Sequence, residues 1–218
     1  LQDNGFVQRN VDAHELAHLV GKDTAAAFGI NGEVFLSCPT SFNYGCQHGF
    51  FQYALVKVNP VKKAIDSICG SLGSEHSIKF KFYCYHGVGH GVMDAESYDL
   101  KASLDICDTL DGIGKDGCWQ GAFMENVNAG MRGEARKDIF SKTDPLAPCN
   151  QVQEKYQHEC YINHAGWLMT FFNNDVDRAI NSCLKAEKFI NICLQSLGLM
   201  ATNPVWQPAL STQSLHLV

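Results

Sequence analysis

The chain has 218 residues, of which 45% are hydrophobic and 18% are charged, a composition that excludes a disordered protein and is typical of a globular one. Its formal net charge of −6 and its sparse basic clusters argue against a nucleic-acid partner. No apolar run is long enough to span a membrane, and no linker divides the sequence, so we expect a single domain over residues 1–218.

Five segments of similar length follow one another along the chain, and each contains two cysteines. Their apolar parts, which start at the second cysteine, begin 38, 34, 42 and 33 residues apart, the length of a helix pair. More polar stretches precede several of them, at residues 61–72, 100–110 and 176–186, with apolar residues three and four apart. This pattern predicts an all-α fold, an array of αα-hairpin repeats arranged as an α/α toroid or a solenoid. An outer helix would end near the first cysteine and an inner helix would start at the second.

Three stretches depart from this pattern. Residues 79–85 alternate as a short strand would, although they lie where an inner helix should start. Residues 128–148 form the longest polar stretch and are predicted to be a loop. Asn203-Pro204 and Pro208 predict an irregular C-terminal tail.

The ten cysteines fall, in chain order, into five couples separated by 8, 15, 11, 11 and 10 positions. This regularity favours five local disulfides, each stabilising by roughly 3 kcal/mol in a chain-entropy description. The alternative is ten buried thiols that serve as small core residues. Disulfides indicate an oxidising compartment, so we expect a secreted or periplasmic protein. The chain begins at Leu1, as expected of a mature form or a fragment whose export signal is gone.

Glycine recurs at one position of the apolar segments. Gly49, Gly87 and Gly121 each stand three residues after the second cysteine of their couple. Because glycine costs about 1 kcal/mol in a helix interior relative to alanine, its recurrence predicts that another backbone or a ligand comes close there.

Histidines recur in the same way. Counted from Asp12 as zero, HELAH places His14 and His18 at +2 and +6, and counted from Cys84, CYHGVGH places His86 and His90 at the same positions. Residues at +2 and +6 lie on one helix face, one turn apart. The corresponding positions of the other segments are His48 and Gln52, and then Gln120 and Met124.

These positions predict a central metal site with His14, His18, His86 and His90 as ligands and His48 as a fifth. Imidazole suits a divalent transition metal such as zinc, copper or iron. Glu125 and Glu15 are the nearby carboxylates that would complete the shell or act as catalytic base. The competing interpretation is that such histidines are ordinary core residues. We expect that role for His158 and His216, and a solvated position for His76.

HELAH also matches H-E-x-x-H and so resembles the helix of the zincin metalloproteases. The resemblance implies zinc held by His14 and His18, with Glu15 as general base. It covers five residues. Gly21 matches the glycine of the longer metzincin motif, whereas Thr24 stands where that motif has a third histidine.

The leading hypothesis is therefore an extracytoplasmic metal-binding protein with a His-lined site, a metal-dependent hydrolase or redox enzyme. Its substrate would be a small molecule or a peptide. The first alternative is a non-enzymatic helical-repeat protein that binds a peptide, a glycan or haem, or that serves as an assembly subunit. The second is a zinc protease of the H-E-x-x-H type.

Overall fold

The computed structural model describes residues 13–133, 140 and 143–201. Every regular element in these residues is a helix and none is a strand, which confirms the all-α fold class. The described chain separates into two compact units, Leu1–Ala122 and Phe123–Val218, with the division inside α7 (Ile113–Arg132). The single domain, the repeat array and its closure into a ring remain predictions.

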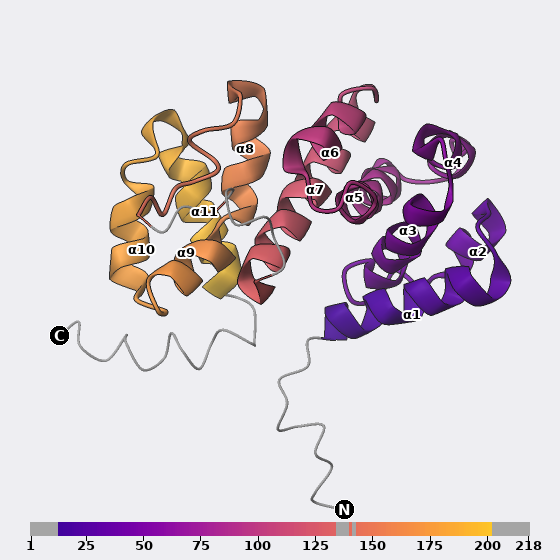
Figure 1. Cartoon of the computed structure of the whole chain (residues 1–218), viewed down its shortest axis with the longest axis horizontal. Helices are drawn as coiled ribbons and strands as arrows, with labels where there is room; N and C mark the ends of the chain where they lie inside the picture. The colour runs from indigo at the N-terminus through magenta and orange to yellow at the C-terminus, as the bar shows by residue number, and fades with distance from the viewer. Residues whose placement is uncertain (1–12, 134–139, 141–142, 202–218) are drawn as a thin grey trace, which may run out of the picture. The chain divides into compact units, whose positions relative to one another are not determined.

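Long and short helices alternate in the first unit (Figure 1). The long helices α1, α3 and α5 lie side by side in this order, and α3 packs against both of its neighbours. The short helices α2, α4 and α6 precede α3, α5 and α7 in the chain. The bounds are α1 (Ala13–Phe28), α2 (Gly32–Ser37), α3 (Gly45–Lys57), α4 (Val61–Ile68), α5 (Ile78–Ala95) and α6 (Leu100–Cys107).

The short helices form where the sequence supplies a cap or an amphipathic face. Asp99 caps α6 by accepting a hydrogen bond from the backbone N–H of Ala102 at 3.0 Å. In α4 the buried residues are Ala64, Ile65 and Ile68, spaced as on one face of a helix. That face packs inward while the lysines of the same helix stay outside.

The long helices approach one another backbone to backbone at glycines. A Cβ built on Gly49 would lie 1.8 Å from the carbonyl oxygen of His18, and one on Gly121 would lie 1.9 Å from that of His86. No side chain fits at these crossings, so glycine is required there. The predicted close approach of another backbone is confirmed at both positions. At Gly87 the nearest atom, at 3.0 Å, belongs instead to an aromatic side chain.

All five predicted disulfides are present, and no cysteine is free. Each closes a short segment between neighbouring elements and lies in the buried interior. The alternative of ten reduced core thiols is therefore wrong for this structure. The pairs are Cys38–Cys46, Cys69–Cys84, Cys107–Cys118, Cys149–Cys160 and Cys183–Cys193.

The second unit is built around its last helix. Helix α11 packs against α8, α9 and α10, with a 3-10 turn, η2, just before it in the chain. His164 separates α8 from α9, so two short helices stand where one long inner helix was expected. The bounds are α8 (Glu154–Asn163), α9 (Ala165–Phe171), α10 (Val176–Cys183), η2 (Glu187–Phe189) and α11 (Ile190–Ala201).

The start of the inner helices differs from the prediction. Helix α5 begins at Ile78, six residues before Cys84, because Ser77 accepts a hydrogen bond from the backbone N–H of Phe80 at 3.1 Å and caps the first turn. Residues 79–85 are consequently helical. A start at the second cysteine is approximately right only for α3, which begins at Gly45.

The predicted loop over residues 128–148 begins later than expected, since residues 128–132 belong to α7. Residues 134–139 and 141–142 lie outside the described part of the chain, as does the predicted irregular tail. Residues 143–153 form turns, so no outer helix occurs in the described residues just before Cys149.

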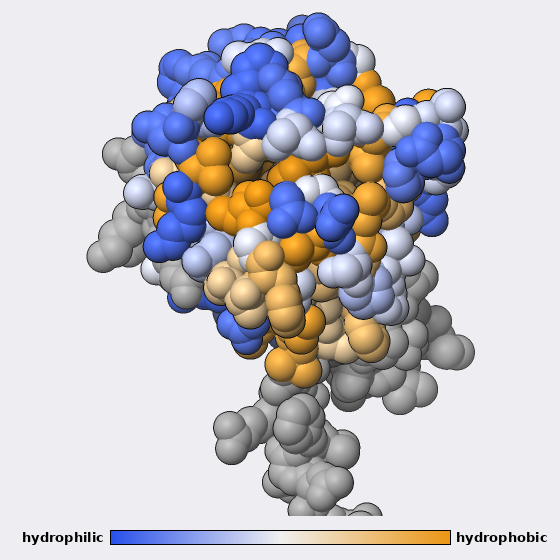
Figure 2. All heavy atoms as spheres, turned by 90° about the vertical axis from the view of Figure 1, so that its right-hand side faces the viewer, coloured by the Kyte–Doolittle hydropathy of each residue, from blue (hydrophilic) through white to orange (hydrophobic). Residues whose placement is uncertain are grey.

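Apolar side chains also reach the surface of the first unit. Figure 2 shows the side on which α1, α2 and α4 lie, where hydrophobic groups gather between hydrophilic ones. Large exposed apolar residues of this unit include Leu19, Val20 and Phe28 of α1. Among the helices described, none has both the length and the apolar character that crossing a bilayer requires.

Candidate metal centre

The five histidines predicted as metal ligands come together within the first unit. The ring centroid of His48, on α3, lies 5.3 Å from those of His14 and His18 on α1. It lies 4.9 Å and 4.8 Å from those of His86 and His90 on α5. Because α1, α3 and α5 cross closely at glycines, side chains at equal positions of successive helices meet. His14, His48 and His86, all at +2, illustrate this.

Burial controls the charge of these rings. His18, His48, His86 and His90 are buried, and His14 is half-buried. Burial lowers the pKa of His48 well below its usual value, and the neighbouring histidines lower it further. Burial also lowers the pKa of His86 to about 3. Both rings are therefore neutral at neutral pH and keep a lone pair that a metal can use.

The first pair of histidines is held with its Nε2 atoms facing each other. His14 Nδ1 lies 2.7 Å from the backbone carbonyl oxygen of Phe42, which can only accept, so His14 Nδ1 carries the proton. His18 Nδ1 similarly donates to Gln52 Oε1 at 2.8 Å. The two Nε2 atoms lie 3.0 Å apart, and in neutral rings each then presents a lone pair to the other. A cation between them would turn this repulsion into attraction.

The second pair repeats this arrangement on α5. His86 Nδ1 donates to Gln120 Oε1 at 3.0 Å, and His86 Nε2 lies 3.3 Å from His90 Nε2. In metal sites the ligating histidine commonly donates its other N–H to a carbonyl or carboxylate oxygen, which orients the ring. His14, His18 and His86 each have such an acceptor.

The spacing of the Nε2 atoms suits a metal ion. Zinc–nitrogen bonds of 2.0–2.1 Å place two ligands of a tetrahedral ion about 3.3–3.4 Å apart. The observed separations of 3.0 Å for His14 and His18 and of 3.3 Å for His86 and His90 are close to that value. The residues present therefore fit a transition-metal ion without rearrangement of the helices.

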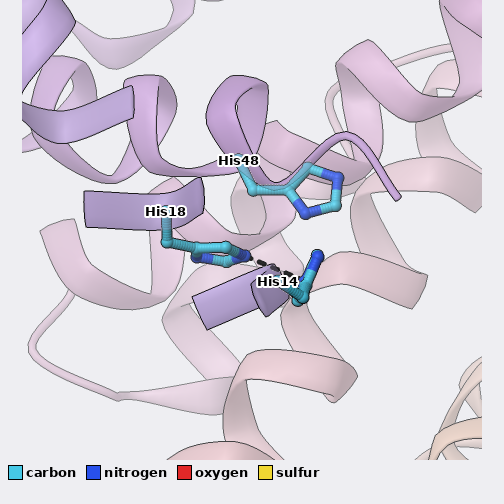
Figure 3. A group of neighbouring side chains, drawn as sticks. All are labelled: His14, His18 and His48. Atoms are coloured by element: carbon cyan, nitrogen blue, oxygen red, sulfur yellow. Dashed lines mark hydrogen bonds between the residues drawn. The ribbon is translucent and has the colours of Figure 1, made fainter. Parts of the chain in front are cut away.

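His48 occupies the middle of the group and differs from the other four. Neither of its ring nitrogens has a hydrogen-bond partner in the described residues, although the side chain is only 1% exposed. Figure 3 shows one of these nitrogens turned toward His14 and His18 and the other turned away from them. Buried polar atoms are normally paired, so an unpaired imidazole at this position calls for a ligand.

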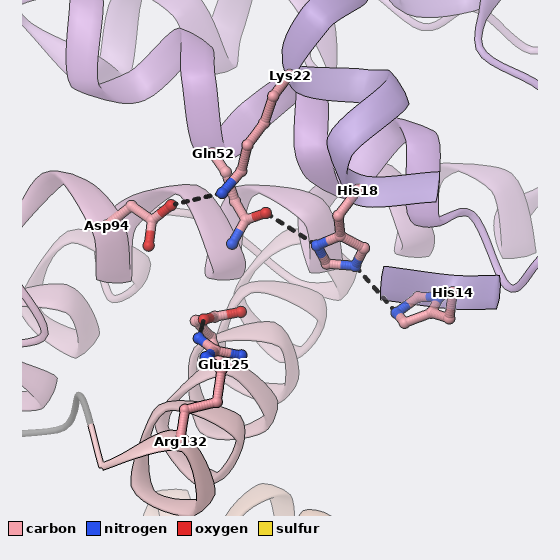
Figure 4. A network of polar contacts seen from close by, with 7 residues as sticks. All are labelled: His14, His18, Lys22, Gln52, Asp94, Glu125 and Arg132. Carbon is pink, nitrogen blue, oxygen red and sulfur yellow. Dashed lines mark hydrogen bonds and ion pairs between the residues drawn. The ribbon is translucent and has the colours of Figure 1, made fainter. Parts of the chain in front are cut away.

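A polar network continues from the histidines along α1 and α5 (Figure 4). One turn beyond His18 and His90, Lys22 Nζ lies 3.7 Å from Asp94 Oδ2, which links the two helices. Lys22 is 38% exposed, so this ion pair contributes little to stability. Its position closes the end of the polar stripe that begins at His14.

The two predicted carboxylates are not part of this group. Glu15 is exposed, whereas His18 beside it on α1 is buried. Glu125 belongs to the second unit, where its buried carboxylate accepts from Arg132 Nη2 at 2.8 Å (Figure 4). Gly21, the residue shared with the metzincin motif, serves the packing of α1 on α3, since a Cβ there would lie 1.9 Å from the carbonyl oxygen of Cys46. The catalytic roles of Glu15 and Glu125 remain predictions.

The other four histidines lie outside this group of five. His164 is buried and donates from Nε2 to the carbonyl oxygen of Pro145 at 2.7 Å, while its Nδ1 has no hydrogen-bond partner in the described residues. Its neighbours Cys149 and Cys160 form a disulfide and so offer no thiolate to a metal. His158 was expected in the core but is exposed, beside the carboxylate of its neighbour in the chain. His76 is partly exposed, and His216 lies outside the described residues.

Gln52, Gln120 and the carbonyl of Phe42 have a role that the sequence did not reveal. The two glutamines were recognised at histidine positions of the pattern, but as further polar side chains of the site and not as hydrogen-bond acceptors for the histidines. Their spacing is a usable signal, because each lies 34 residues after the histidine that it accepts from. The carbonyl of Phe42 carries no sequence signal, since every residue has one.

Comparison of the chain with protein-family models, with curated proteins and with solved structures finds no match. The functional assignment therefore depends on the chemistry of the site.

Proposed function

We propose that the protein binds a transition metal in an oxidising, extracytoplasmic compartment, through His14, His18, His48, His86 and His90. The observation that carries this proposal is the buried ring of His48, whose two nitrogens lack hydrogen-bond partners in the described residues. Leaving such atoms unpaired is costly, and a metal–nitrogen bond removes the cost. The five disulfides support a secreted or periplasmic location.

The donor set favours copper or zinc, with iron next. The group consists of imidazole nitrogens alone, and these suit late first-row metals better than magnesium or calcium. All ten cysteines are in disulfides, so thiolate ligands are absent. Among divalent ions of the first row, copper binds nitrogen sites most tightly.

A bound metal of this class would activate water or a small substrate, or exchange electrons if it is copper or iron. The protein's own residues hold the ligand rings in one tautomer, through Gln52, Gln120 and the carbonyl of Phe42, and they exclude bulk water by burial. The role of Glu125 or Glu15 as base in a hydrolytic reaction on a small molecule or peptide is proposed from the sequence pattern alone.

Two of the alternatives have less support. In a zincin the glutamate must face the metal beside its histidines, whereas Glu15 is exposed and His18 is buried. The described residues also contain no strand against which a peptide could be aligned. Haem would need space between its ligands, but the imidazole rings are in direct contact, with centroids 4.5–5.3 Å apart.

A non-enzymatic binding function has one observation in its favour, in the second unit. A cavity of about 540 Å³ is lined there by the basic side chains of Arg178 and Lys185 and by the rings of Phe171 and Phe172. The buried hydroxyl of Ser182, also in the lining, has no partner in the described residues. The lining also includes Asp144, so it suits a small polar ligand with an apolar part.

Metal analysis of untagged protein tests the proposed function. Protein stripped with a chelator, reloaded with zinc or copper and desalted should retain the metal, and His14→Ala and His86→Ala should retain much less. His158→Ala is the matched control, because this exposed histidine should not affect retention. Parent protein that retains no metal, or variants that retain as much as the parent, would contradict the proposal.

Casein digestion tests the protease alternative. If that alternative is right, the parent should cleave casein and Glu15→Gln should not.

A further inference from the structure

We propose that the histidine group is a two-metal centre in which the imidazolate of His48 bridges the ions. This inference depends on the proposed metal-binding function and specifies its architecture. One ion would be held by His14, His18 and His48, and the other by His48, His86 and His90.

The ligand atoms are divided into two sets. Within each set they lie within 4.8 Å of one another, and the two sets share only His48. A single tetrahedral ion would need all its nitrogens about 3.3–3.4 Å apart, a condition that is approached within each pair. The ring centroids of His18 and His90, from different pairs, are 5.1 Å apart, as are those of His86 and His90 within one pair, so the division depends on the ligand nitrogens and not on the ring positions. The geometry therefore suits one ion per pair.

Each pair also has its own supports for orienting its rings. The carbonyl of Phe42 and the amide of Gln52 orient the two rings on α1, and the amide of Gln120 orients His86 on α5. Each proposed ion would therefore have at least one ligand ring that is held in place by an outer contact.

His48 is the residue that can join the two ions. Its ring contacts both pairs, with its centroid 5.3 Å from both rings of one and 4.9 Å and 4.8 Å from those of the other, and it is stacked on the ring of His90. Within the described residues it has no hydrogen-bond acceptor for an N–H and no donor for its lone pair, whereas His14, His18 and His86 each have an acceptor. Figure 3 shows its nitrogens on opposite sides of the ring, one of them toward His14 and His18. A bond from each nitrogen to one ion satisfies both.

The bridge has a defined proton balance. A neutral imidazole carries one N–H, so bridging breaks that N–H bond, forms two metal–nitrogen bonds and transfers the proton to the buffer. The other four rings bind as neutral imidazoles. No oxidant or reductant is needed, because the metal ions enter in their divalent state.

Copper loading of the full chain tests this architecture. We expect two Cu²⁺ ions per chain and, because spins couple through an imidazolate, an electron paramagnetic resonance signal that integrates to much less than two spins. His48→Gln should lose the coupling, so that whatever copper it retains gives its full signal. His158→Gln should behave as the parent does. Circular dichroism of each variant shows whether its helices are intact.

Variants of one pair at a time give an independent test that leaves His48 in place. Replacing both His14 and His18 by alanine should reduce the copper content from two ions to one, with a full single-ion signal, and replacing both His86 and His90 should do the same. One ion per parent chain, or two ions with two full spins, would overturn the bridge while the metal-binding function stands. A parent chain that takes up no ion would overturn both.

Discussion

His48 in the first unit and His164 in the second are both buried, but in the described residues His48 has no hydrogen bond through either ring nitrogen, whereas His164 lacks one only at Nδ1. His48 lies among four other imidazoles and makes no hydrogen bond in the described residues through either nitrogen. His164 interrupts a helix and donates from Nε2 to the carbonyl oxygen of Pro145. Burial alone therefore does not mark a metal ligand. What distinguishes His48 is its position on a face that successive helices share.

The packing of the long helices explains this difference. In the first unit glycines bring helix backbones into contact, so short imidazole side chains from three helices reach one another. In the second unit α8 and α9 replace one long helix, and His164 lies at the break between them. Its side chain donates a hydrogen bond to the backbone carbonyl oxygen of Pro145, in the turns that precede α8.

The largest expected effect comes from closing a glycine crossing. In Gly49→Ala the new Cβ would lie 1.8 Å from the backbone carbonyl of His18, and neither helix can yield without moving the histidines. We expect a loss of about 3 kcal/mol or more in the free energy of unfolding, measured with denaturant, together with weaker metal retention.

The matched control for this substitution lies in the second unit. Gly198→Ala places its Cβ in open space on α11, so the change should be neutral or should stabilise by up to about 1 kcal/mol. Equal losses in the two variants would show that the close crossing of α1 and α3 does not set the stability of the first unit.

In metal-free protein, replacing each of the two buried histidines by leucine should change the free energy of unfolding by a smaller amount, and the two changes should differ in sign. His48→Leu removes two buried nitrogens that have no hydrogen-bond partner among the described residues, so we expect no loss, or a gain of up to about 1 kcal/mol, in the free energy of unfolding. His164→Leu takes the donor from the buried carbonyl of Pro145 and should cost about 1–3 kcal/mol. Denaturant titrations of both variants, with chelator present, measure these changes.

The sign of the His48→Leu effect is the informative result. A large loss in metal-free protein would mean that His48 contributes to the fold itself. It would then resemble His164, and the contrast between the two would fail.

The last prediction concerns pH, and its expected effect is small over any single pH unit. Burial lowers the pKa of His164 to about 4, against about 6.5 in the unfolded chain, so between these values the unfolded state binds more protons. The stabilisation is complete above pH 6.5 and is lost as the pH falls toward 4. In metal-free His164→Gln, the pH dependence of the free energy of unfolding in this window should be shallower by up to about 1.4 kcal/mol per pH unit.

The exposed His158 supplies the control for the pH experiment. His158→Gln should leave the slope unchanged, because no buried ring is removed. A parent slope that His164→Gln does not alter would show that other groups control acid stability.

Much of the candidate site was predictable from sequence because it depends on periodicity. Equal spacing of His14 and His18, and of His86 and His90, from one reference position placed four histidines on matching helix faces. Gly49 and Gly121 indicated how closely the helices approach. Both the histidine spacing and the glycine positions follow from the repeating pattern. The helices cross at the glycines, and histidines at equal positions of successive helices are in contact.

Other features escaped prediction because they depend on contacts distant in sequence. The cysteine pattern predicts that the inner helix starts at Cys84, but α5 starts at Ile78 because Ser77 caps its first turn. The exposure of Glu15 and the ion pair of Glu125 with Arg132 depend on which helix surfaces are covered. The hydrogen bond from His14 to the carbonyl of Phe42 joins residues 28 positions apart.

By itself, the sequence determined the helical class, the five disulfide pairs and the alignment of the histidines, because each follows from spacing along the chain. Only the tertiary structure decided that His48 is the ring with no hydrogen-bond partner in the described residues, while the Nδ1 atoms of His14, His18 and His86 each have an acceptor. A buried ring nitrogen forms a hydrogen bond only if the packed helices bring an acceptor or donor within reach of it. The identity of an unsatisfied atom is therefore a property of the packed helices and is not encoded in any single segment.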